Sequence, residues 1–180
     1  MVRVGIAMLA LLGLAACAGG PTASAPPGPR PLATAMPISP DQDFLNRAAT
    51  GTGNEIALGE LGQQRGYSAS VRAFGAHIAA EHTRAHASLM ALARRLALAP
   101  TETTADLSGL AALAGPEFDR QFIADQVKNQ RDALALFNSA AQTGLDPRLR
   151  HFAREWIGAL RRDLARAENI AAGIGALALR

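Results

Sequence analysis

Four polar residues fall within faces that are otherwise apolar when the chain is drawn as helices of 100° per residue. They are Glu55, His82, Gln130 and Asp163, one in each of four segments. Carboxylates and imidazoles are transition-metal ligands, and with amides they also form buried hydrogen-bond networks. Because an unsatisfied buried polar group costs about 1–3 kcal/mol, we expect these side chains to be satisfied by one another, by water, by a small polar ligand or by a metal.

The expected heights of the four residues along their helices indicate one shared polar layer. At about 1.5 Å per residue, Glu55 and His82 lie roughly 17 and 22 Å from the first hairpin turn. Gln130 and Asp163 lie roughly 21 and 26 Å from the second turn. We favour a structural hydrogen-bonded network for this layer. The alternative is a metal centre of Glu55, His82 and Asp163, helped by His86 or Gln130.

Other histidine patterns are less informative about metal chemistry. A dinuclear carboxylate centre needs Glu-x-x-His on two helices, and no such motif occurs at a suitable place, which disfavours ferroxidase chemistry. His86 follows His82 by four residues, a spacing that can share a metal, yet His86 lies at the edge of the apolar face, where a histidine is more often just a half-buried side chain. His77 and His151 are expected at the surface. No cofactor is predicted beyond this transition-metal alternative.

The elements that must position these residues are four amphipathic helices, expected from 41 to about 65, from 68 to about 98, from 117 to 144 and from 146 to at least 170. Pro100, Pro116 and Pro147 fall between the periodic segments and never inside them. Asp41, Ser68 and Asp146 are the expected N-caps. The tight links at Gly66-Tyr67 and Gly144-Leu145 predict two antiparallel hairpins. Residues 99–115 between the hairpins are long enough to cross the bundle. The predicted fold class is all-α, a four-helix bundle over 41–180.

Composition excludes several classes of protein. Hydrophobic residues make up 49% of the 180-residue chain and aromatic residues only 4%, which favours helices over a β-sandwich. The net charge of +3 is spread along the chain, so nucleic-acid binding has little support. No nucleophile elbow, phosphate-binding loop or dinucleotide fingerprint is present. Enzymatic activity is therefore uncertain and not the favoured interpretation.

The N-terminus predicts export and lipidation. Residues 1–16 carry Arg3 and an apolar run typical of a signal peptide. Leu14-Ala15-Ala16-Cys17 resembles the lipobox of bacterial lipoproteins, in which the cysteine takes a diacylglycerol and the amine an acyl group such as palmitate. Residues 17–40, with seven of the ten prolines, are expected to be a disordered tether. Because Ala18 follows Cys17, resemblance to Gram-negative sorting rules implies the outer membrane, with the domain facing the periplasm.

Several short motifs resemble an exported, ferritin-like bacterial family whose domain is of unknown function. They include Glu55-Ile56-Ala57-Leu58-Gly59, Glu81-His82-Thr83, Gln126-Val127 and Asp163-Leu164. The resemblance spans about 41–171 and implies a ferritin-like bundle in the cell envelope with no established activity. Family members commonly have His at the positions of Gln130 and Asp163, and often Pro at that of Gly158, so the metal ligand set is incomplete here.

The function predicted from the sequence is non-enzymatic binding or scaffolding by a lipid-anchored envelope protein. Its expected partners are the membrane, reached through the anchor at Cys17, and an envelope component or a second copy of the chain. The alternative function is metal binding or redox chemistry at Glu55, His82 and Asp163, in a ferritin-like core site that has lost part of its ligand set.

Overall fold

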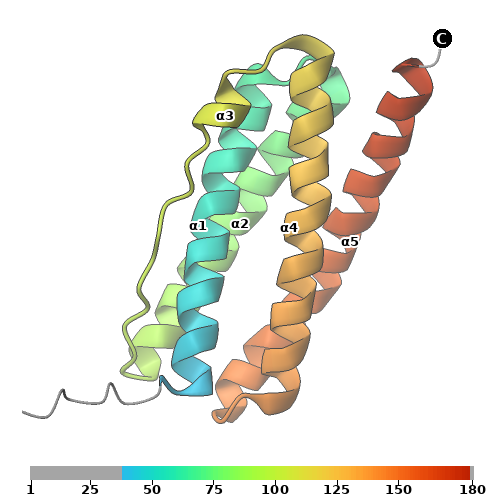
Figure 1. Cartoon of the computed structure of the whole chain (residues 1–180). Coiled ribbons are helices and arrows are strands. Elements are labelled where there is room, and N and C mark those ends of the chain that lie inside the picture. The colour runs from blue at the N-terminus through green and yellow to red at the C-terminus, as the bar shows by residue number, and fades with distance from the viewer. Residues whose placement is uncertain (1–37, 179–180) are drawn as a thin grey trace, which may run out of the picture. The chain divides into compact units, whose positions relative to one another are not determined.

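The computed structural model describes residues 38–178 (Figure 1). The predicted signal peptide, Cys17 and the tether up to residue 37 lie outside the described residues. Every regular element in the described part of the chain is a helix, and the predicted all-α class is confirmed. None of these helices combines the length and apolar character needed to cross a membrane.

Four long helices form a bundle of two antiparallel hairpins (Figure 1). Helices α1 (Pro40–Arg65) and α2 (Ala69–Arg95) make the first hairpin, and α4 (Gly115–Thr143) and α5 (Pro147–Ala178) make the second. Helix α1 packs against α4 and α2 packs against α5. The helix α2 ends three residues earlier than expected, because Ala97 adopts a left-handed φ of 54° and Leu98 N–H bonds back to Ala93 O at 3.0 Å.

The long connection from α2 to α4 runs beside α1 for much of the bundle's length, as Figure 1 shows. Amide N–H groups of the connection donate to side chains one helical turn apart on α1. The bonds are Thr101 N to Asn46 Oδ1, Thr103 N to Thr50 Oγ1 and Ala105 N to Asn54 Oδ1. Two residues of the extended connection advance about 7 Å, and four residues of helix α1 advance about 6 Å. The spacing of the donors on the connection therefore matches the spacing of the acceptors on α1. The connection then forms the short helix α3 (Ser108–Ala111).

Each hairpin turn is held by a carboxylate from the other hairpin. Asp119, near the start of α4, is 2% exposed and accepts hydrogen bonds from the backbone N–H groups of Tyr67 and Ser68, at 2.7 and 2.8 Å. The α1–α2 turn therefore depends on α4. The predicted cap at Ser68 is confirmed, because its hydroxyl accepts from Val71 N.

Asp41 does the same for the α4–α5 turn. Its carboxylate accepts from the backbone N–H groups of Leu145 and Asp146, at 2.7 and 2.9 Å. The expectation that Asp41 caps α1 is thus wrong. Ser39 is the N-cap, with its hydroxyl accepting from Gln42 N, and the carboxylate of Asp41, two residues further on, is free to bind the other hairpin.

The two hairpins repeat the same construction at a constant separation of 78 residues. Arg72 donates to the carbonyls of Gly66 and Tyr67, and Arg150 donates to those of Gly144 and Leu145. Buried aromatic and aliphatic residues recur at the same offset. The equivalent pairs are Asp41/Asp119, Phe44/Phe122, Leu45/Ile123, Gly66/Gly144, Val71/Leu149, Arg72/Arg150 and Phe74/Phe152.

Glycine allows α1 and α2 to touch backbone to backbone. A Cβ on Gly59 would lie 2.6 Å from Ala79 N and 2.8 Å from Gly75 O. A Cβ on Gly75 would lie 2.7 Å from Gly59 O. Gly59 of α1 therefore lies at a close contact between the two helices. Gly51 of α1 does not, because nothing lies within 4 Å of the position of its Cβ.

Candidate functional sites

Glu55 is buried in α1 and is held by two amides of α4. Its carboxylate accepts from Gln126 Nε2 at 2.8 Å and from Asn129 Nδ2 at 2.7 Å. Burial raises the pKa of Glu55 to about 7, although both amide donors act in the opposite direction. The nearby carboxylate of Asp163 adds a smaller upward effect on this pKa.

His82 and Gln130 are buried with polar atoms that have no partner. His82 is 5% exposed and its Nδ1 makes no hydrogen bond, and Gln130 is fully buried with neither Oε1 nor Nε2 bonded. Burial lowers the pKa of His82 to about 4, helped by the neighbouring His77. His82 is thus neutral over the physiological range. Buried polar groups are rarely left in this state without a ligand or water.

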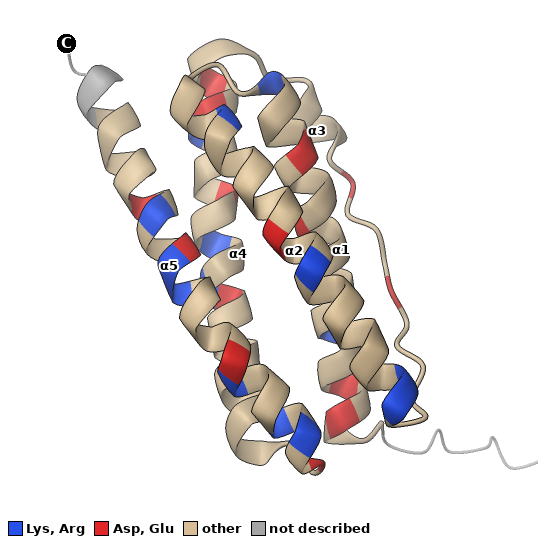
Figure 2. Ribbon diagram, turned by 180° about the vertical axis from the view of Figure 1, so that it is seen from behind, with Lys and Arg blue, Asp and Glu red and all other residues tan. Residues whose placement is uncertain are grey.

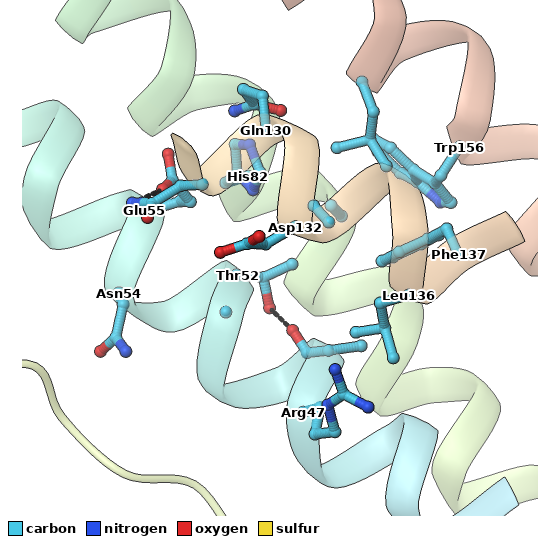
Figure 3. Close-up of a pocket in the computed structure, with 16 residues that line it drawn as sticks. Arg47, Thr52, Asn54, Glu55, His82, Gln130, Asp132, Leu136, Phe137 and Trp156 are labelled. Carbon is cyan, nitrogen blue, oxygen red and sulfur yellow. Dashed lines mark hydrogen bonds between the residues drawn. The ribbon is translucent and has the colours of Figure 1, made fainter. Parts of the chain in front are cut away.

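Both residues line a cavity of about 240 Å³ between the hairpins (Figure 3). Figure 3 shows Glu55, His82 and Gln130 toward one side of the cavity and the side chains of Phe137 and Trp156 toward the other. The cavity opens between α1 and α4, where its lining includes exposed residues. These are Arg47, Gly51 and Asp132.

Asp163 belongs to a different cluster, on the side of the bundle where α2 meets α5. His77 Nε2 lies 2.9 Å from Asp163 Oδ1 and 3.0 Å from Glu81 Oε2. One ligand atom from each of the three residues lies within 4.8 Å of the others. Burial raises the pKa of Asp163, while its hydrogen bond with His77 acts to lower it. His77 was expected at the surface, but it is only partly exposed and pairs with the buried carboxylate of Asp163.

His86 is separate from both groups of residues. Its Nδ1 shares a 2.9 Å hydrogen bond with Thr52 Oγ1, and its Nε2 lies 3.8 Å from Glu102 on the connection. The half-burial expected for His86 is observed. His151 is exposed, as expected, and pairs only with Glu155 one turn along α5, at 3.2 Å.

The predicted polar residues are therefore all buried, but they divide into two places. Glu55, His82 and Gln130 line the cavity, whereas Asp163 faces His77 and Glu81. No hydrogen bond joins any two of the predicted four within the described part of the chain. Glu55 is bonded to amides of α4 and Asp163 to His77 of α2. The i, i+4 spacing of His77 and Glu81 was a visible signal for the second cluster.

The surface charge is mixed rather than concentrated. Basic and acidic residues are interspersed along α5 (Figure 2). Five of the six arginines of α5 are exposed, and the sixth, Arg150, is half-buried because it binds the turn carbonyls. Arg166 lies over the ring of Phe74 at 5.5 Å.

The chain matches the family described as domain of unknown function DUF4142 over residues 26–170. It belongs to this family. No curated protein sequence matches it.

Several solved structures share the fold of this DUF4142 protein. A putative secreted DUF305 protein from Streptomyces coelicolor has a TM-score of 0.68 and 12% identity, covering 76% of this chain and 94% of that one. A DUF305 fragment from Deinococcus radiodurans has a TM-score of 0.66 and 16% identity, covering 75% and 97%. CopM in its Cu(I)-bound form has a TM-score of 0.63 and 16% identity, covering 72% and 93%.

Proposed function

We propose that this DUF4142 protein is a lipid-anchored domain of the cell envelope that binds one divalent transition-metal ion through His77, Glu81 and Asp163. The observation that carries the proposal is the convergence of one imidazole and two carboxylates within 4.8 Å. Its role is binding, with no catalytic step assigned. The anchor is Cys17, and the outer membrane facing the periplasm is the proposed location.

The cluster has the burial expected of a built site rather than of a chance surface contact. The Asp163 side chain is 4% exposed, that of Glu81 14% and that of His77 36%. A metal ion can therefore enter from solvent beside His77 and meet carboxylates that have already lost most of their water. The ligands come from α2 and α5, so a bound ion would also link the two hairpins.

The distances suit exchange of a proton for a metal. His77 Nε2 lies within 3.0 Å of both carboxylates, which is hydrogen-bond geometry with a proton on that nitrogen. Metal binding requires the deprotonated imidazole nitrogen, so the ion would take the place of this proton. Affinity is thus expected to rise with pH.

The donor set selects the class of metal. Nitrogen and carboxylate oxygen suit borderline divalent ions such as Zn²⁺ and Cu²⁺, whereas Cu(I) and Ag(I) prefer thiolate and thioether sulfur. Met90 is the only sulfur-containing residue in the described part of the chain, and it is not in the cluster. Structures of CopM exist in Cu(I)-, Cu(II)- and silver-bound forms, which supports metal binding on this fold.

Calorimetric titration of the mature chain, purified without an affinity tag in detergent, tests the metal site. We expect Zn²⁺ and Cu²⁺ to bind at one ion per chain, and His77→Ala or Asp163→Asn to weaken binding at least about tenfold. The matched control is His151→Ala, which removes an exposed histidine from a His–Glu pair that has no third ligand. Equal loss of binding in His151→Ala, or no loss in His77→Ala, would contradict the site.

Membrane fractionation tests the anchor separately. Cys17→Ser removes the acceptor of the diacylglycerol and should release the protein from the membrane fraction into the soluble periplasmic fraction. An unchanged membrane fraction would refute lipidation and leave the metal proposal standing.

A further inference from the structure

We propose that the cavity lined by Gln130 and His82 is a second binding site, which takes a small uncharged ligand with a carboxamide-like polar group and a flat apolar body. The site shares no residue with the His77–Glu81–Asp163 cluster. It is therefore independent of the metal proposal.

The polar half of this site is defined by Gln130. The residue is completely buried, lines the cavity and leaves both a donor, Nε2, and an acceptor, Oε1, without a partner. A ligand that offers one acceptor and one donor side by side would satisfy both atoms, and a carboxamide has this pattern. The unbonded Nδ1 of His82 lies in the same lining and adds a third polar contact.

The apolar half of the site is aromatic and aliphatic. Phe137 and Trp156 lie across the cavity from Gln130 and His82 (Figure 3), with Leu136 and Leu160 also in the lining. A cavity of about 150 Å³ holds a benzene-sized molecule. The present cavity of about 240 Å³ therefore has room for a ring that carries a polar group.

The charges around the cavity favour an uncharged ligand. Both carboxylate oxygens of Glu55 already accept amide hydrogen bonds. Arg47 and Asp132, the charged residues at the mouth, have opposite signs and highly exposed side chains. A charged ligand would have to leave water for a cavity whose buried carboxyl group, Glu55, is already hydrogen-bonded to two amides, and this is costly.

Four ring compounds of similar size test the proposed ligand class. They are benzamide, its anionic analogue benzoate, its cationic analogue benzamidinium and the apolar toluene. Binding is followed by NMR through the indole N–H signal of Trp156, the only tryptophan of the chain, at about pH 5.5 in the metal-free full mature protein. We expect a saturable shift with benzamide and at least about tenfold weaker binding of the other three.

Two variants make the result specific to Gln130. Gln130→Leu keeps the side-chain volume but removes the amide. It should weaken the binding of benzamide at least about tenfold and leave the binding of toluene unchanged. Gln142→Leu, an exposed glutamine on the same helix, is the matched control and should bind as wild type. If Gln130→Leu does not fold, Ala133→Leu fills the cavity from its half-buried edge and should abolish the shift.

Three outcomes would overturn the proposal. No saturable shift with benzamide would mean that water alone occupies the cavity. Benzamide binding that survives both cavity variants would place the ligand elsewhere. Tighter binding of benzamidinium than of benzamide would make this a cation site, with Glu55 as its counter-charge.

Discussion

The two hairpins of this DUF4142 protein are alike at their ends and different in their middles. At the ends, the turn glycine, the arginine that binds the turn carbonyls and the carboxylate from the other hairpin all recur after 78 residues. In the middle, each buried polar residue of the predicted layer has a smaller or apolar equivalent. The pairs are Glu55/Ala133, His82/Leu160, Gln130/Thr52 and Asp163/Ala85.

This difference separates the residues that hold the fold from those to which we assign proposed binding roles. The repeated ends satisfy backbone N–H groups and orient the helices, and a bundle needs both copies. The middle of each hairpin differs from that of the other, and its buried polar groups are not needed for the packing that the two hairpins share. The His77–Glu81–Asp163 cluster follows the same pattern, because the equivalents of His77 and Glu81 are Glu155 and Ala159.

The largest expected effect comes from the close contact that only the first hairpin has. Gly75→Ala places a methyl group against the backbone of α1 and should lower the free energy of unfolding by about 3 kcal/mol or more. The equivalent residue in the second hairpin is already Ala153. Urea denaturation would measure the loss. Gly51→Ala is the control, because Gly51 is also inside a helix but has open space around the position of its Cβ. This substitution should raise the free energy of unfolding by about 0.5–1 kcal/mol.

The second effect is the pH dependence of the polar middle. Glu55 is protonated in both states below pH 4.5, and between there and pH 7 only the unfolded chain ionises, so rising pH lowers the free energy of unfolding. His82 acts in the opposite direction, because between pH 6.5 and 4 only the unfolded chain gains a proton as the pH falls. Each contribution amounts to at most roughly 3 kcal/mol, and the two largely cancel.

Single substitutions should reveal these opposite slopes. Between about pH 4.5 and 6.5, with chelator present, stability of Glu55→Gln should rise with pH relative to wild type. Stability of His82→Gln should fall with pH over the same range. Urea midpoints at several pH values measure both. Parallel pH profiles in the two variants would show that the groups are not buried in the folded protein as described.

The third effect probes the repeated ends. Asp119→Ala and Asp41→Ala each remove a carboxylate that accepts two backbone hydrogen bonds, and should cost about 2 kcal/mol each. Similar losses would support the equivalence of the two ends. Asp43→Ala, an exposed carboxylate in the same turn as Asp41, should change stability by less than about 0.5 kcal/mol. A loss confined to one of the two ends would contradict the equivalence.

The smallest effect concerns the extended part of the connection, residues 101–105, which is hydrogen-bonded to α1 of the first hairpin. Asn46→Ala removes the acceptor for Thr101 N and should cost about 0.5–1 kcal/mol in thermal or urea unfolding. Faster hydrogen exchange should be restricted to the connection near Thr101. Faster exchange throughout α4 and α5 would mean that the connection supports both hairpins.

The helices were predictable from sequence because periodicity and prolines mark them directly. The same periodicity predicted the burial of the four polar residues, because it shows which face of a helix each residue occupies. These residues are Glu55, His82, Gln130 and Asp163. Periodicity does not state which neighbour that face meets, so the pairing of Asp163 with His77 was missed. The role of Asp41 was missed for a related reason, since its partners lie more than a hundred residues away in the chain.

The most direct measurement is a crystal structure of the Zn²⁺-loaded protein with anomalous scattering at the zinc edge. A single strong peak is predicted at about 2.0–2.2 Å from His77 Nε2 and from carboxylate oxygens of Glu81 and Asp163, with the cavity beside Gln130 free of metal. A peak between Glu55 and His82, or no peak inside the bundle, would contradict the assignment of metal binding to the α2–α5 cluster.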